Sequence, residues 1–173
     1  MENRSNGKTA LLIDGARRVG KSYIAKEFAQ NEYESHIIID FGNAPKDVLD
    51  LFESDSADLD LFFAKLVLFY GTPLTNRKSL IVFDEVQQFP RARQLIKYLV
   101  ADGRYDYLET GSLIRLKKNV QNIIIPSEED HIEMFPMALK NSCGPWEMRL
   151  QSHFSDRHLR QRNRWETLST GRS

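Results

Sequence analysis

The amino-acid sequence predicts a three-layer α/β sandwich, in which helices cover both faces of a parallel sheet. Short apolar segments alternate along the chain with longer amphipathic ones, as strands and helices do in this fold class. The apolar segments are continuous runs, which suits strands buried on both faces. The 173 residues, 41% of them hydrophobic, fit one domain with a substantial core, and no internal repeat is visible.

The expected strands are aliphatic runs bounded by turn residues. The first leads directly into a glycine loop, and the second has three consecutive isoleucines at its centre. We expect the first strand to be central in the sheet, with the fourth strand beside it. The strands are predicted at Thr9–Asp14, His36–Asp40, Ser79–Asp84 and Tyr105–Thr110, with later candidates at Ile123–Ile125 and His131–Met134.

The expected helices are longer segments with apolar residues at helical spacing. After the glycine loop, Ile24, Ala25 and Phe28 fall on one face of a helix. A proline at position 90 suits the first turn of the last helix. The helices are predicted at Lys21–Gln30, Pro45–Phe52, Leu59–Tyr70 and Pro90–Ala101.

Composition limits the classes of protein to which the chain can belong. The net charge is zero, which gives no general attraction to nucleic acid or membranes, and no apolar run approaches the roughly 20 residues that cross a bilayer. Cys143 is the single cysteine, so an intrachain disulfide and an all-cysteine metal site are excluded. The N-terminus is polar and has no signal-peptide core. We therefore expect a cytoplasmic protein.

The glycine loop between the first strand and the first helix matches G-x-x-x-x-G-K-[ST] in full. Glycines allow a tight turn whose N–H groups point inward at phosphate oxygens, and the helix adds the positive end of its dipole. An ordinary glycine turn would not need this strand–loop–helix context, and a Rossmann loop needs a different spacing. The predicted phosphate-binding residues are Gly15, Ala16, Arg17, Arg18, Val19, Gly20, Lys21 and Ser22.

Two carboxylates end the third strand, where a phosphate-binding sheet of this kind needs acids. Lys21 is expected to contact the β- and γ-phosphates of ATP, and Ser22 and Asp84 to hold Mg²⁺. Glu85 is expected to orient and polarise the attacking water, a role that a hydrolase requires. An aliphatic run that ends in Asp-Glu is weak evidence for such a site by itself, but the glycine loop upstream strengthens this interpretation.

Small hydroxyl residues end the fourth strand. Thr110 and Ser112 are predicted to help position the water beside the γ-phosphate. The alternative role for Ser112, which does not exclude the first, is to cap a helix over Leu113–Leu116. The candidates for an arginine that stabilises charge in the reaction are Arg91, Arg93, Arg104 and Arg115, and the sequence does not choose among them.

Taken together, these motifs resemble the prokaryotic predicted ATPases of the AAA+ superfamily, over about residues 8–137. The resemblance rests on the Arg-rich glycine loop, on Phe83–Gln87, on Thr110–Ser112 and on Phe135–Met137. It implies a strand inserted between the loop strand and the acidic strand. It also implies a helical lid and a C-terminal domain of unknown function, neither of which we expect in residues 138–173.

The expected domain organisation is thus an ATPase core at residues 1–137 and a basic tail at residues 138–173. The body carries a small acidic excess and the tail a basic one. Codons exist for Ala138–Leu150 that, read in a shifted frame, encode a continuation of the family pattern. An out-of-frame tail is our first hypothesis, disorder of a genuine tail the second, and a nucleic-acid-binding arm the third. The coding DNA decides the first.

Three functional hypotheses follow for the chain. The first is an ATPase that uses Mg²⁺ and acts on a protein partner or on the missing domain, alone or as a homo-oligomer. The second is a nucleotide-binding module with little or no hydrolysis, because the lid is missing. The third is a phosphotransferase with a small substrate. A GTPase is disfavoured, since the chain has no Asn-Lys-x-Asp segment.

Overall fold

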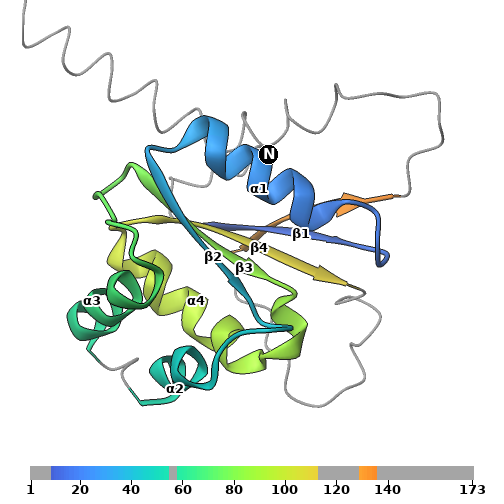
Figure 1. The fold of residues 1–173 in the computed structure, drawn as a ribbon. Coiled ribbons are helices and arrows are strands. Elements are labelled where there is room, and N and C mark those ends of the chain that lie inside the picture. The colour runs from blue at the N-terminus through green and yellow to red at the C-terminus, as the bar shows by residue number, and fades with distance from the viewer. Residues whose placement is uncertain (1–8, 55–57, 113–128, 136–173) are drawn as a thin grey trace, which may run out of the picture. The chain divides into compact units, whose positions relative to one another are not determined.

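A parallel five-stranded sheet forms the centre of the protein. The computed structural model describes residues 9–54, 58–112 and 129–135, which belong to one compact unit, Lys8–Met137. In this part of the chain the strands lie in the order β2-β3-β4-β1-β5, all of them parallel (Figure 1). The predicted α/β fold is confirmed. The strands are β1 Ala10–Gly15, β2 Ser35–Asp40, β3 Ser79–Asp84, β4 Asp106–Ser112 and β5 Glu129–Met134.

The glycine-loop strand β1 occupies an interior position in this sheet. Leu11 of β1 is in register with Leu108 of β4 on one side and with Asp130 of β5 on the other. β4 also pairs with β3, so it separates the loop strand from the acidic strand. The inserted strand was predicted and is confirmed. The first strand was expected to be central; it lies in the interior of the sheet, fourth of the five described strands, and β4 holds the middle position.

Helices cover both faces of the sheet (Figure 1). One face carries α1, and the opposite face carries α2, α3 and α4. A short 3-10 turn, η1, joins β3 to α4. The helices are α1 Lys21–Glu32, α2 Lys46–Ser54, α3 Leu59–Tyr70 and α4 Pro90–Asp102, and η1 is Val86–Gln88.

Aromatic side chains fill much of the core between the sheet and α2, α3 and α4. The ring of Phe52 on α2 lies edge-on to Phe62 of α3 at 5.1 Å and to Phe83 of β3 at 5.6 Å between centroids. Phe41, which follows β2, contacts the same cluster. Edge-to-face pairs of this kind add to the stabilisation from burial. The cluster therefore fixes the carboxyl end of β3, where the two predicted acids begin.

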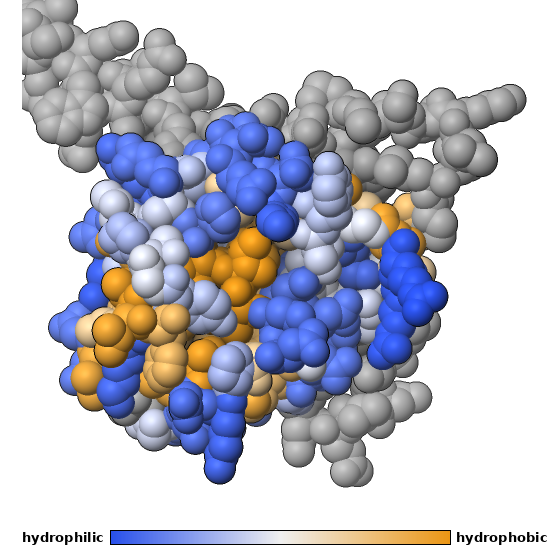
Figure 2. Space-filling view, in the orientation of Figure 1, coloured by the Kyte–Doolittle hydropathy of each residue, from blue (hydrophilic) through white to orange (hydrophobic). Residues whose placement is uncertain are grey.

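Helix α3 carries apolar residues on its solvent side as well as in the core. Leu61, Leu68 and Phe69 are 43%, 82% and 48% exposed. In Figure 2 apolar residues gather at the lower left, over the region of α3 in Figure 1. The helix starts at Asp58, whose carboxylate accepts hydrogen bonds from the N–H groups of Asp60 and Leu61.

The predicted element boundaries agree with the structure to within two residues. Prediction ended the fourth strand at Thr110, whereas β4 continues to Ser112 because Gly111 and Ser112 pair in register with Asp14 and Gly15 of β1. Sheet pairing overrides the low strand propensity of glycine here. β5 begins two residues earlier than predicted. The candidate strand Ile123–Ile125 and the predicted tail at 138–173 lie outside the described residues.

Candidate functional site

The loop from β1 to α1 takes backbone conformations that explain its glycines. Gly15 has φ 152°, and a Cβ atom there would lie 2.1 Å from the carbonyl oxygen of Met134 on β5. Gly20 has φ 96° at the start of α1, and Arg18 also has a positive φ of 62°. A side chain at Gly15 would separate β1 from β5, and at Gly20 it would strain the backbone. The sequence requirement for glycine at both positions is therefore steric.

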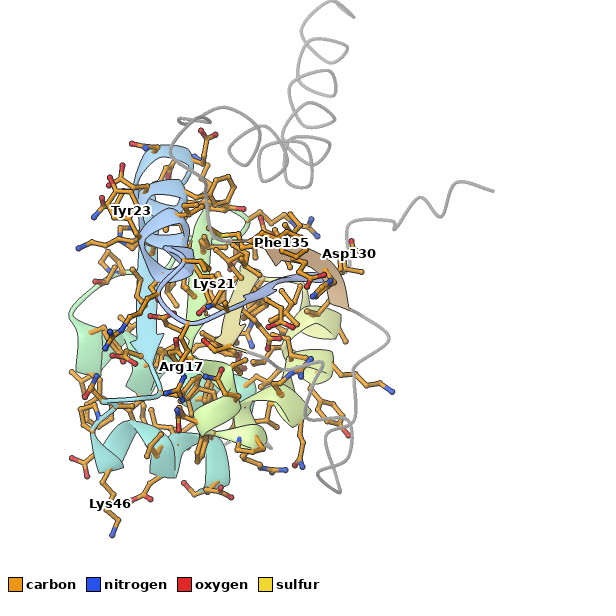
Figure 3. The ribbon with its side chains drawn as sticks, turned by 90° about the vertical axis from the view of Figure 1, so that its right-hand side faces the viewer. Arg17, Lys21, Tyr23, Lys46, Asp130 and Phe135 are labelled. Carbon is orange, nitrogen blue, oxygen red and sulfur yellow. The ribbon has the colours of Figure 1, made fainter. Side chains whose placement is uncertain are left out.

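Lys21 places a positive charge beneath this loop. The side chain is 4% exposed and lies in the first turn of α1, beside the strands (Figure 3). Its Nζ donates to the carbonyl oxygens of Gly15 at 3.3 Å and Ala16 at 2.7 Å, and to Oγ of Ser112 at 3.1 Å. All three acceptors are neutral. Within the described residues no carboxylate pairs with Lys21, so its buried charge has no counter-ion there.

Asp84 gathers two hydroxyl groups at the carboxyl end of β3. Oγ of Ser22 donates to Asp84 Oδ1 at 2.8 Å, and the hydroxyl of Thr110 donates to the same oxygen. Thr110 in turn accepts the backbone N–H of Glu85 at 3.2 Å. Parallel strands end at the same edge of the sheet, which is why residues from α1, β3 and β4 meet here. The result is a compact group of oxygen atoms at the carboxyl end of the sheet.

Glu85, the residue after Asp84, is held by two side chains. Its backbone is left-handed, with φ 54° and ψ 44°, and this turns the side chain away from the line of β3. One carboxylate oxygen accepts from the Ser112 hydroxyl at 3.4 Å, and the other from the Gln87 side-chain amide. Ser112 thus accepts from Lys21 and donates to Glu85. It joins the ammonium to the carboxylate through one hydroxyl.

The family comparison matches what this geometry suggests. A family model described as an AAA domain matches residues 7–143, which is most of the chain. The chain belongs to the AAA domain family. A comparison with curated proteins gave no match.

As an AAA domain, the chain has a P-loop NTPase-type fold, and the structure brings its predicted site residues together. Lys21 contacts Ser112, Ser112 contacts Glu85, and Ser22 and Thr110 share Asp84. The remaining predicted phosphate-binding residues form the turn itself, namely Gly15, Ala16, Arg17, Arg18, Val19 and Gly20. Ser112 is the last residue of β4, and the alternative helix cap depends on residues 113–116, outside the described part.

Two of the arginines proposed for charge stabilisation have other partners in this AAA domain. Arg104 precedes β4, at the edge of the sheet opposite the phosphate loop, where it pairs with Asp60 at 2.5 Å and Asp102 at 2.7 Å. Arg93 on α4 is 4% exposed and faces Glu109 of β4 at 3.9 Å. Both pairs are explained by packing of α4 and the neighbouring loops. Arg91 is 3.9 Å from Glu53, and Arg115 lies outside the described residues.

Sequence reasoning missed Gln87 as a site residue. Gln87 was noted only as part of a family pattern, whereas its side chain spans Glu85 and the backbone N–H of Ser112, which is 3.2 Å from Gln87 Oε1. A glutamine three residues after a strand end is ordinarily solvated. The sequence did contain one indication, since Gln87 is two residues from Glu85 and a turn can bring side chains at that spacing into contact.

The residues present fit a polyphosphate with a divalent cation. A buried ammonium without a counter-ion is stabilised by an anionic ligand, and the phosphate loop supplies N–H groups beside it. A serine hydroxyl within 2.8 Å of a carboxylate provides hard oxygen donors of the kind that Mg²⁺ prefers. Ser22 and Asp84 could therefore hold Mg²⁺. In the part of the chain described, no helix is both long and apolar enough to cross a membrane.

Proposed function

We propose that this AAA domain binds ATP with Mg²⁺ and hydrolyses its terminal phosphoanhydride bond. The observation that carries the proposal is the Lys21 ammonium at the base of a full phosphate-loop motif. It is 4% exposed, and its hydrogen-bond partners in the described part of the chain are all neutral oxygens. A triphosphate would supply the missing negative charge. Bound Mg²⁺ would neutralise charge that develops on the phosphate oxygens.

Each residue of the site has a task in this proposal. Lys21 and the loop N–H groups bind and orient the phosphates. Glu85 accepts a proton from water as the water oxygen bonds to the γ-phosphorus and the bond to the bridging oxygen breaks, which leaves ADP and phosphate. Thr110 and Ser112 fix the positions of Asp84 and Glu85 through their hydroxyl groups.

A second candidate function is a nucleotide-binding module that hydrolyses ATP slowly or not at all. It is favoured by the state of Glu85, because both of its carboxylate oxygens are engaged by Gln87 and Ser112. A carboxylate held by two donors meets water only through the remaining lone pairs of its oxygens, which restricts the directions from which water can approach. The two candidates agree on binding and differ in turnover.

The binding step is tested by Lys21→Ala. With Mg-ATP at about 100 times Kd, wild-type protein should gain about 2.7 kcal/mol of stability, seen as a rise of several degrees in Tm. Lys21→Ala should show no such rise, because the ammonium that meets the phosphates is gone. Each protein is compared with itself with and without ligand, so any change in intrinsic stability cancels. A full ligand-induced rise in Lys21→Ala would reject the phosphate-binding role.

The hydrolysis step is tested by Glu85→Gln. This change keeps the shape of the side chain and removes its basicity, so ATP binding should remain while phosphate release falls at least about 100-fold. Wild-type protein that binds ATP and releases no phosphate supports the binding module instead. Release onto a small acceptor but not onto water would support a phosphotransferase. Competition by GTP in the same binding assay measures the selectivity for the base.

A further inference from the structure

A single glutamine side chain connects the proposed catalytic carboxylate to the end of β4. Gln87 lies in η1, two residues after Glu85, and is half-buried. Its Nε2 donates to Glu85 Oε2, and its Oε1 accepts the backbone N–H of Ser112 at 3.2 Å. Chemistry fixes this orientation of the amide, since a carboxylate only accepts and a backbone N–H only donates.

The contact exists because of the backbone at Glu85. A left-handed residue at the end of β3 reverses the chain into η1, and the turn is closed by the N–H of Gln88 donating to the carbonyl of Glu85 at 2.9 Å. This reversal brings Gln87 back over the strand end. Its side chain then reaches β4, where Ser112 is held by pairing with Gly15 on β1. Gln87 is thus anchored to the sheet at its oxygen and to Glu85 at its nitrogen.

Glu85 is fixed at both carboxylate oxygens by this arrangement. Ser112 contributes its hydroxyl to Oε1 at 3.4 Å, and Gln87 contributes its amide to Oε2. A carboxylate held at one oxygen can still swing about its own axis, whereas two donors define its plane. The orientation of the carboxylate therefore depends on Gln87.

We propose that Gln87 is a positioning residue for ATP hydrolysis, which acts by holding the Glu85 carboxylate in a defined place. The inference rests on the proposed function of Glu85. Gln87 acts through the Glu85 carboxylate, the group that meets the attacking water. Removal of the amide should lower kcat and leave nucleotide affinity in place, because the Lys21 ammonium bonds to Gly15, Ala16 and the Ser112 hydroxyl and not to the Gln87 side chain.

Two variants distinguish the role of the Gln87 amide donor, which contacts Glu85, from that of its oxygen, which anchors the side chain to Ser112. Gln87→Met keeps the length of the side chain and removes both polar atoms. Gln87→Glu keeps an oxygen for the Ser112 N–H and replaces the donor by a charge that repels Glu85. We expect kcat to fall about 10- to 100-fold in both variants, with Kd for Mg-ATP within about threefold of wild type. Near-normal kcat in Gln87→Glu would show that only the anchor to β4 matters and would overturn the proposal.

Gln88→Met is the matched control. Gln88 lies in the same turn, and its side chain is exposed. Its kcat and Kd should equal those of wild type. If Gln88→Met loses as much activity as Gln87→Met, or if Gln87→Met weakens ATP binding in step with kcat, the effect comes from general loosening of the turn and the proposal fails.

A measurement that needs no turnover separates failure of this inference from failure of the proposed function. In ¹⁵N-labelled protein, the side-chain amide of Gln87 is identified by its absence in Gln87→Met. Glu85→Ala should move that amide proton upfield, while the amides of Gln88 and Gln94 stay in place. An unmoved Gln87 signal overturns the inference. Wild-type protein that shows the shift but releases no phosphate overturns hydrolysis and keeps the contact.

Discussion

At the scale of single residues, the candidate site combines side chains placed by the fixed spacing of a motif with one side chain, Gln87, placed by a turn. Lys21 and Ser22 follow Gly20 directly at the start of α1, and Asp84 ends a strand whose apolar run is unmistakable. Gln87 could not be predicted in this way, because its contact depends on a left-handed backbone at Glu85, where a glutamate has no local preference for that conformation. A site residue whose position depends on a left-handed turn can therefore be identified from the structure but not from the sequence.

Two buried tyrosines allow a test of what one hydroxyl contributes to stability. Tyr107 on β4 is 2% exposed, burial raises the pKa of its hydroxyl, and that hydroxyl has no hydrogen-bond partner among the described residues. A buried polar group without a partner costs about 1–3 kcal/mol. We expect Tyr107→Phe to raise the free energy of unfolding by about 1 kcal/mol, measured by urea denaturation.

Tyr33 is the matched control for this change. It is also buried, but its hydroxyl donates to Asp106 Oδ2 at 2.9 Å. Tyr33→Phe removes the same atom and leaves the Asp106 carboxylate without that donor, so it should lower stability by about 1–2 kcal/mol. Equal effects of the two substitutions would contradict the assignment of partners.

At the scale of helices and strands, periodicity predicted which elements exist, and pairing decided where they end. Leu59–Tyr70 was predicted without error, because Asp58 before it and Gly71 after it are strong helix-boundary residues. The end of β4 was predicted two residues early, since Gly111 and Ser112 have no strand propensity of their own. Gly111 and Ser112 are extended because they pair with β1, and the residues next to them in the sequence do not indicate that pairing.

The N-cap of α3 gives a prediction at this scale. Asp58 accepts two backbone hydrogen bonds, from Asp60 at 3.0 Å and from Leu61 at 3.1 Å. Asp58→Ala leaves these N–H groups to water and should cost about 1 kcal/mol of unfolding free energy. Asp58→Asn retains an oxygen in the same place and should cost much less. The two are compared by thermal unfolding, and a loss in Asp58→Asn equal to that in Asp58→Ala would contradict capping by hydrogen bonds.

At the scale of the whole molecule, the order of the strands followed from resemblance to a family and not from spacing. Nothing in the residues of β4 states that it lies between β1 and β3, because buried parallel strands are all similar apolar runs. The site depends on this order, since Thr110 reaches Asp84 and Ser112 reaches Lys21 only from an intermediate strand. Composition and periodicity predicted a sheet covered by helices on both faces, and the family resemblance predicted the order of its strands.

The close approach of Gly15 to β5 gives a prediction for the sheet as a whole. A methyl group at Gly15 would overlap the carbonyl oxygen of Met134, which is backbone and cannot rotate aside. Gly15→Ala should therefore separate β5 from β1 and cost at least about 3 kcal/mol, measured by chemical denaturation. Gly20→Ala is the control, because a methyl group at that position would meet no atom within 4 Å, and it should cost only about 1 kcal/mol of backbone strain.

The pairing of β1 has a consequence for how the protein is made. β1 leaves the ribosome before its two neighbours, because β4 and β5 are formed by residues 106–112 and 129–134. At cellular elongation rates this leaves the apolar segment Ala10–Ile13 without a strand partner for on the order of ten seconds. The strand that leads into the phosphate loop therefore completes its pairing late in translation, and its apolar side chains are open to aggregation until then.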